Sequence, residues 1–150
     1  MVQSFSSLFV HLVFSTKGRR MVLSDSVRDS LHAYMGKVLQ NLGCTPVLIN
    51  SVEDHVHLLF NLARTVAVSK AIQDVKSSSS QWLKTQGAAF AEFSWQVGFG
   101  VFSISESDVE SVREYIAGQR EHHRRIAFQD EYRELMRRHG IKFDEQYGWD

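Results

Sequence analysis

The chain has 150 residues, is 43% hydrophobic, and balances 17 lysines and arginines against 17 aspartates and glutamates. This length favours a single compact domain that comprises all residues 1–150. The neutral charge balance excludes an overall electrostatic field that would attract nucleic acid or an anionic membrane, so any site that binds a polyanion must be local. A single cysteine (Cys44), no secretory signal and no apolar run long enough to span a bilayer lead us to expect a cytoplasmic protein without a membrane segment.

Hydrophobic periodicity and turn residues divide the chain into strands and helices. In chain order they predict a central strand at 7–15, a helix from an N-cap at Ser24 to a stop at Gly43, and a hairpin in which the tight turn Glu53-Asp54 links a short strand at 47–52 to the histidine strand that ends at Phe60. A helix from an N-cap at Thr65 to Gly87, a strand at 95–104, a helix from Ser105 toward Arg125 and a last helix at about 130–139 follow. The serine run 77–80 could instead be a linker, but apolar spacing resumes at Trp82 and favours helix. The tail 141–150 is expected to be irregular.

The order strand, helix, strand, strand, helix, strand is that of the split ferredoxin-like arrangement, which RRM domains share. The predicted fold class is therefore α+β, an antiparallel βαββαβ sheet with helices on one face and extra C-terminal helices that carry Tyr115. The first and third strands of such a sheet are central neighbours. Strand 53–60 would thus lie in the middle of the sheet, with the helix that begins at Ser105 as its cover.

Two histidines one residue apart, His55 and His57, lie in that central strand. Because side chains alternate along a strand, Val56, Leu58 and Phe60 would face the core while both imidazoles point together at the opposite layer. Two ligands leave a metal ion under-coordinated, so a metal site would need a third ligand from elsewhere in the chain. The pair alone is a weak signal for metal binding and slightly favours one hydrogen-bonded and one solvated histidine with no metal.

Tyr115 and Gln119 are four residues apart in the helix that begins at Ser105, so they share one helix face. The glutamine oxygen could supply a third ligand, and the tyrosine hydroxyl could attack a metal-bound phosphate. An oxygen-rich completion of the site favours Mg²⁺ or Mn²⁺ over a structural zinc ion. His122 and His123, three and four residues further on, are alternative third ligands.

Four segments that span almost the whole chain resemble a known protein family. They are the opening strand leading into Phe14-Ser15-Thr16-Lys17, the pair His55-Val56-His57 after an acidic residue, the run from Trp95 to Ser103 with its glycines, and Tyr115-Ile116-Ala117-Gly118-Gln119 followed by His122-His123. The family is that of the single-tyrosine transposases of the His-hydrophobic-His nuclease superfamily, of the IS200/IS605 type, which move insertion sequences as single-stranded DNA.

The resemblance implies that His55, His57 and Gln119 bind the divalent metal and that Tyr115 attacks the DNA phosphate, giving a 5′-phosphotyrosine and a free 3′-hydroxyl. It implies single-stranded DNA with hairpin ends as the partner. It also implies a homodimer in which the tyrosine helix of one subunit completes the histidine site of the other. The family includes host-domesticated relatives that bind repetitive palindromes, and this alternative function stays open.

Two local basic clusters are predicted to contact DNA phosphates, which would make DNA binding sensitive to salt. One comprises Lys17, Arg19 and Arg20, and the other comprises Arg124 and Arg125 with the preceding His122 and His123. Both clusters could instead be ordinary solvated surface.

Two rival functions remain open. A phosphoesterase could use the histidines directly, but Leu59 interrupts a His-x-His-x-His series and no second His-x-Thr or His-x-Ser pair is present. A non-catalytic nucleic-acid-binding module on a ferredoxin-like sheet would normally carry aromatic and basic residues on its strands, where this chain has paired histidines. An assay for a covalent protein–DNA adduct separates all three functions.

Overall fold

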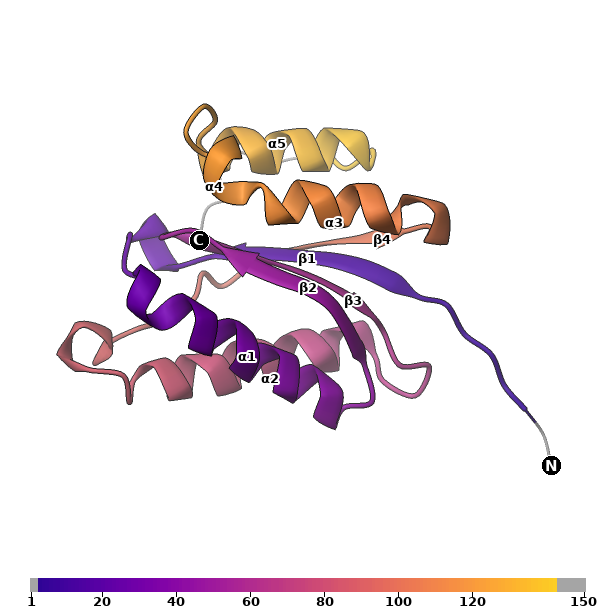
Figure 1. Ribbon diagram of the computed structural model, residues 1–150, viewed down its shortest axis with the longest axis horizontal. Helices are drawn as coiled ribbons and strands as arrows, with labels where there is room; N and C mark the ends of the chain where they lie inside the picture. The colour runs from indigo at the N-terminus through magenta and orange to yellow at the C-terminus, as the bar shows by residue number, and fades with distance from the viewer. Residues whose placement is uncertain (1–2, 143–150) are drawn as a thin grey trace.

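The computed structural model describes residues 3–142 and has a single antiparallel sheet in its middle layer (Figure 1). The sheet consists of β1 (Phe9–Ser15), β2 (Thr45–Ser51), β3 (His55–Asn61) and β4 (Gly100–Ile104) in the order β2-β3-β1-β4. The predicted α+β class and the pairing of the first and third strands at the centre are therefore confirmed. The tail 143–150, including Tyr147, lies outside the described residues.

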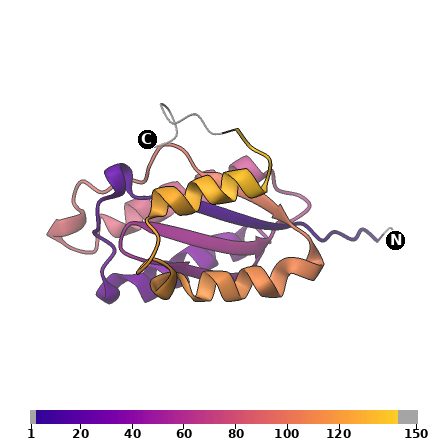
Figure 2. The same ribbon diagram turned by 90° about the horizontal axis from the view of Figure 1, so that it is seen from above.

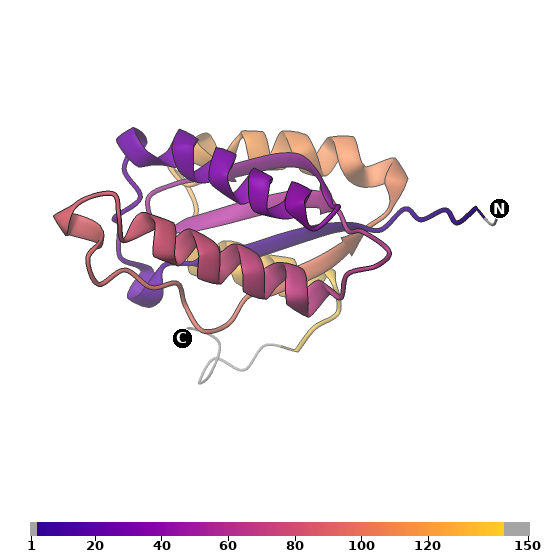
Figure 3. The ribbon, with the colours of Figure 1, turned by 90° about the horizontal axis from the view of Figure 1, so that it is seen from below.

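Helices cover both faces of this sheet. The lower face carries α1 (Asp25–Asn41) and α2 (Val68–Leu83), side by side in Figure 3, and the upper face carries α3 (Val109–Ala117), α4 (Gln119–His122) and α5 (Phe128–Arg138), seen from above in Figure 2. Three short 3-10 turns complete the described part of the chain: η1 (Lys17–Arg19), η2 (Ala88–Phe90) and η3 (Glu106–Asp108). The layer over the upper face is what encloses the predicted histidine pair. Among residues 3–142 no helix is long and apolar enough to cross a bilayer.

The main hydrophobic core lies between the sheet and the pair α1 and α2. Val56, Leu58 and Phe60 of β3 are fully buried there, together with Leu12 and Phe14 of the neighbouring strand. This confirms the alternation predicted for β3, because its odd-numbered histidines point to the opposite face. Full burial of one such side chain contributes about 1.5–3 kcal/mol, so the register that directs both imidazoles upward is strongly preferred over a one-residue slip.

A second, smaller apolar cluster holds α5 on the upper face. Residues at positions i, i+4 and i+7 of α5 pack onto two residues of the sheet. They are Phe128, Tyr132 and Leu135 of the helix and Val13 and Phe102 of β1 and β4. This packing sets the rotation of α5 about its own axis, and Glu131, one residue before Tyr132, is consequently buried over the histidines.

The strand predicted at 95–104 is shorter in the structure and begins only at Gly100. The ammonium of Lys76 donates hydrogen bonds to the carbonyls of Gln96 (2.7 Å), Val97 (3.2 Å) and Gly98 (3.0 Å). Those carbonyl oxygens face Lys76 and do not pair with a neighbouring strand, so residues 95–99 form a loop before β4.

The helix predicted to run without interruption from Ser105 toward Arg125 is broken at Gly118 between α3 and α4. The side-chain amide of Asn50 on β2 donates to the carbonyl of Ile116 at 2.8 Å and to that of Ala117 at 3.4 Å. These hydrogen bonds satisfy carbonyls that a continuing helix would use. The starts of two other helices differ from the prediction by two residues. The N-cap of α2 is Ala67 and not Thr65, and α5 begins at Phe128 and not at about residue 130.

Candidate active site

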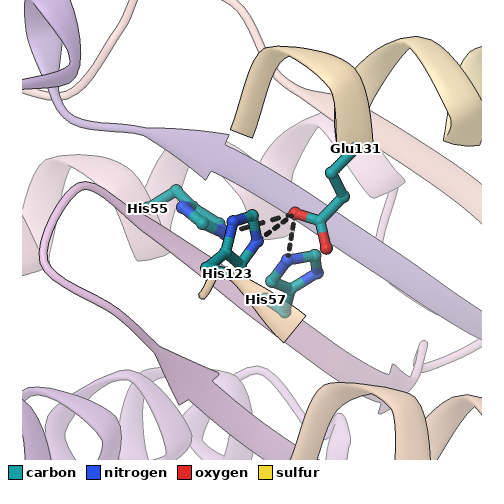
Figure 4. Close-up of side chains that lie close together, drawn as sticks. All are labelled: His55, His57, His123 and Glu131. Atoms are coloured by element: carbon teal, nitrogen blue, oxygen red, sulfur yellow. Dashed lines mark hydrogen bonds and ion pairs between the residues drawn. The ribbon is translucent and has the colours of Figure 1, made fainter. Parts of the chain in front are cut away.

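One buried carboxylate oxygen lies where three histidines converge on the upper face of the sheet (Figure 4). Glu131 Oε1 lies 3.2 Å from His55 Nε2, 3.1 Å from His57 Nε2 and 3.0 Å from His123 Nε2. The ligand atoms of these four residues all lie within 4.8 Å of one another. Such a convergence of imidazole nitrogens and a carboxylate is the arrangement of groups that can hold a metal ion.

The other oxygen of the same carboxylate binds the two residues predicted on the third helix. Glu131 Oε2 accepts a hydrogen bond from the hydroxyl of Tyr115 and another, 3.0 Å long, from Nε2 of Gln119. The amide oxygen of Gln119 lies 3.2 Å from His55 Nε2. The structure therefore brings His55, Tyr115 and Gln119 together within one chain, although a helix break separates the last two.

Further side chains orient the two histidines of β3. His55 Nδ1 lies 2.7 Å from Asp54 Oδ1, and His57 Nδ1 lies 2.7 Å from Nε2 of His11 on the adjacent strand β1. Each imidazole therefore has one nitrogen held from behind and its Nε2 directed at Glu131. A partner on the rear nitrogen fixes the tautomer and the ring orientation, which are properties of a preorganised ligand.

The charges in the cluster follow from burial and these hydrogen bonds. Burial lowers the pKa of His55, but the hydrogen bonds with Asp54 and Glu131 outweigh it and raise that pKa to about 9. Burial also lowers the pKa of His57. For Glu131, burial opposes ionisation, yet the electrostatic influence of the adjacent His57 and hydrogen bonds from the surrounding histidines hold its pKa well below the usual range. The cluster thus pairs an ionised carboxylate with a protonated His55.

The phenol of Tyr115 is not activated in this arrangement. Burial and the adjacent charge of Glu131 raise the pKa of Tyr115 well above its usual range. The hydroxyl is consequently protonated at neutral pH and acts as a hydrogen-bond donor. Its reaction with a phosphate would require additional positive charge near the phenol.

The donor set favours a metal ion that accepts both nitrogen and oxygen ligands. Three imidazoles suit transition metals, whereas a carboxylate suits Mg²⁺ and Mn²⁺ alike. Of the two ions predicted from the sequence, Mn²⁺ fits three nitrogens and one carboxylate better. Gln119 lies beside the four residues of this donor set. Of the two histidines predicted as alternatives to Gln119, His123 belongs to the donor set. His122 Nε2 is buried without a hydrogen-bond partner, 3.4 Å from Glu131 Oε2.

The remaining tyrosines among residues 3–142 lie elsewhere. Tyr34 stacks on Trp82 with its ring centroid 5.4 Å away, below the sheet. Tyr132 is buried in the cluster that holds α5, and burial raises its pKa to about 12. Within the described chain, Tyr115 is the one tyrosine hydroxyl that is bonded to the histidine–carboxylate cluster.

The two predicted basic clusters lie at the end of the sheet where β1 finishes. Lys17 and Arg20 are exposed in and after η1, and Arg124 and Arg125 are exposed between α4 and α5. Arg19 is half-buried between these segments. Arg19 lines a pocket together with His123, and Arg124 and Arg125 directly follow His123 in the chain, whereas Lys17 and Arg20 line a different pocket. The DNA-phosphate contacts of both clusters stay a prediction.

Residues 4–119 match the family model of the IS200-like transposases, which is more than half of the chain. The chain belongs to this family. The ISDra2 transposase TnpA of Deinococcus radiodurans is similar to it, 22% identical over 114 residues that cover 73% of this chain and 81% of that protein.

Two solved structures share the fold of this IS200-like transposase. A Deinococcus radiodurans protein assigned as a transposase matches with a TM-score of 0.62 and 23% identity, over 79% of this chain and 98% of that one. A REP-associated tyrosine transposase, solved bound to a REP hairpin, matches with a TM-score of 0.58 and 15% identity, over 82% of this chain and 74% of that one.

The family match contains only part of the cluster. It includes both histidines of β3 and ends at Gln119, so His123 and Glu131 lie beyond it. Sequence reasoning left His123 as one of two alternatives and missed Glu131 and His11. A usable signal existed for His11, because the antiparallel pairing of β1 with β3 gives it the same face as His57.

Proposed function

We propose that this IS200-like transposase cuts and rejoins single-stranded DNA at hairpin-bearing element ends through a covalent bond between Tyr115 and the 5′ phosphate. The observation that carries the proposal is the hydrogen bond from the Tyr115 hydroxyl to the carboxylate on which three histidines converge. Membership of a transposase family supports DNA as the substrate.

In the proposed reaction, Tyr115 Oη bonds to the phosphorus while the bond from phosphorus to the 3′ oxygen breaks. The phenol loses its proton, and the departing 3′ oxygen gains one, which leaves a 5′-phosphotyrosine and a free 3′-hydroxyl. One phosphodiester is exchanged for another, so a second 3′-hydroxyl can reverse the step and rejoin the strand without an external energy source.

The residues that would hold the divalent cation are His55, His57, His123 and Glu131, with the Gln119 oxygen adjacent. A bound cation supplies positive charge that polarises the phosphate and favours the phenolate. Asp54 and His11 keep the two β3 imidazoles oriented, and the buried setting strengthens each electrostatic contact. We propose Mn²⁺ as the better fit and Mg²⁺ as the second.

Metal affinity should increase with pH, because His55 must lose its proton to become a ligand. Its pKa is raised to about 9, so below that pH each bound ion expels one proton from His55. We expect affinity to rise about tenfold per pH unit from neutral pH and to level off near the His55 pKa. Calorimetry of Mn²⁺ binding in buffers of different ionisation enthalpy measures the released proton. An affinity independent of pH over this range would contradict the proton assignment.

The proposed function is tested with 5′- and 3′-labelled hairpin oligonucleotides taken from the two flanks of the gene. Incubation with Mn²⁺ should yield a protein–DNA adduct that survives denaturing electrophoresis and retains the label on the 5′-phosphate side of the cut. Chelation of the metal should reduce the adduct by about a thousandfold or more. Cutting without an adduct would favour a phosphoesterase, and binding without cutting would favour a domesticated palindrome-binding protein.

We also propose that Lys17, Arg19, Arg20, Arg124 and Arg125 bind the DNA, and that the protein acts as a homodimer. The positions of Arg19, Arg124 and Arg125 near His123 support the first proposal, since cations there can neutralise DNA phosphates. The family resemblance supports the second.

A further inference from the structure

A pocket of about 400 Å³ opens directly beside the histidine–carboxylate cluster. His123, a member of the cluster, forms part of its wall, and so do Asp54 and Phe128, which contact His55. Its opposite wall is the turn after β1, with Arg19 and Met21. A strand of DNA with its phosphate at the cluster would therefore have an adjoining nucleotide within reach of this pocket.

The mouth of the pocket is apolar without belonging to either hydrophobic core. Met21 is 72% exposed and Ile126 is 39% exposed, and both side chains line the pocket. A flat apolar ligand that inserted between them would remove exposed apolar surface from water. A methionine is also an adaptable partner for an aromatic ring.

The charges in the pocket argue against a phosphate as its occupant. The carboxylates of Glu53 and Asp54 line it alongside a single arginine, Arg19. Glu53 already pairs with Arg28 (3.3 Å) and Arg120 (3.6 Å), and Asp54 pairs with His55 (2.7 Å), so these neighbouring cations are engaged by carboxylates. A neutral nucleobase, in contrast, meets hydrogen-bonding groups between apolar walls.

The polar side chains that could recognise a base are held in place by an unusual backbone. Arg19 has a φ of 55°, directly after Gly18 with a φ of 65°, and among residues 3–142 it is the one non-glycine residue with a positive φ. With the amide of Gln129 turned so that its oxygen faces the guanidinium, that oxygen accepts hydrogen bonds from Arg19 Nε (3.3 Å) and Arg19 Nη2 (3.2 Å). A left-handed arginine that is fixed beside a reactive cluster is the kind of local strain found at binding sites.

We propose that this pocket binds one unpaired purine next to the cut phosphate, with Arg19 and Gln129 contacting its edge and Met21 and Ile126 its faces. Arginine and glutamine are the side chains that pair with the N7 edge of guanine and adenine, which pyrimidines lack. The assignment rests on the proposed function, because it presupposes single-stranded DNA at the cluster. It adds to that function the type of base that selects the position of the cut. It also changes the expected role of Arg19 from a phosphate contact to a base contact.

The test is equilibrium binding of a hairpin oligonucleotide from the flank of the gene, with each unpaired nucleotide in turn made abasic or changed to a pyrimidine. For the unmodified protein with Mn²⁺, one position should stand out, with about a tenfold loss of affinity for either change. Gln129→Ala and Arg19→Gly should bind the purine oligonucleotide as weakly as the unmodified protein binds the abasic one. Glycine at position 19 keeps the left-handed backbone without strain.

A matched control on the same helix is Arg133→Ala, which removes an exposed cation paired with Asp130. It should leave the purine preference intact. All four proteins should bind the abasic oligonucleotide equally, which separates loss of a base contact from general damage to the site.

The inference is wrong if no position discriminates, if the discriminating position prefers a pyrimidine, or if the preference persists in both pocket variants. Variants that also bind the abasic oligonucleotide more weakly would equally overturn it. Because this test measures binding and not cleavage, the purine pocket can be confirmed even if no Tyr115 adduct forms. Adduct formation without any discriminating base would contradict the purine pocket and leave the proposed cleavage reaction intact.

Discussion

Tyr115→Phe is expected to abolish the covalent protein–DNA adduct, with a loss of about three orders of magnitude or more, because no other hydroxyl in the described chain is bonded to the cluster. The ring and its packing remain, so the variant should fold and bind the hairpin with unchanged affinity. Denaturing electrophoresis measures the adduct, and fluorescence anisotropy measures binding. The matched control is Tyr34→Phe, which removes a hydroxyl from a ring stacked on Trp82 below the sheet. An adduct that persists in Tyr115→Phe would remove this residue as the nucleophile.

The same variant decides whether the tyrosine acts within its own chain. In the structure Tyr115 lies over His57 of the same chain, with ring centroids 6.0 Å apart. Mixing Tyr115→Phe chains with His57→Ala chains should then restore no activity, since neither chain has a complete site. A dimer that exchanges its tyrosine helices would instead recover about a quarter of the unmodified activity, because half of the dimers are mixed and each has one intact site.

The parts of the site that the sequence predicted are those set by local periodicity. The alternation of Val56, Leu58 and Phe60 with the two histidines needs only the geometry of one strand, and the structure buries it as predicted. The order of elements was likewise sufficient to place β1 next to β3. The pairing of these strands in turn explains why a histidine from β1 stands behind His57.

The parts that could not be predicted depend on contacts between distant segments. Glu131 lies in a helix whose existence was predicted, but a single glutamate among charged neighbours normally faces solvent. It is buried because the apolar stripe of α5 packs on Val13 and Phe102, which fixes the helix rotation. The break after Ala117 similarly depends on Asn50, which is 66 residues from its partner Ile116 in sequence.

Glu131 therefore provides the sharpest test of the metal donor set. Glu131→Gln retains the size of the side chain but removes the charge that faces three imidazoles, and we expect Mn²⁺ affinity to fall by about a hundredfold or more. DNA cleavage should fall with it, as in His57→Ala, while hairpin binding survives, because the basic clusters lie outside the cluster of ligands.

The matched comparison is Gln119→Ala, which removes the oxygen that the sequence put forward as third ligand and leaves His55, His57, His123 and Glu131 in place. If the four residues are the ligands, Gln119→Ala should weaken metal binding far less than Glu131→Gln does. Calorimetry on both variants, with circular dichroism to verify folding, measures the difference. The opposite result, with metal binding lost in Gln119→Ala and retained in Glu131→Gln, would make Gln119 the third metal ligand after His55 and His57. Glu131 would then be only a hydrogen-bond partner of Tyr115. Because a buried carboxylate among imidazoles and an amide oxygen differ in charge, the two donor sets also differ in how strongly they hold Mn²⁺ over Mg²⁺.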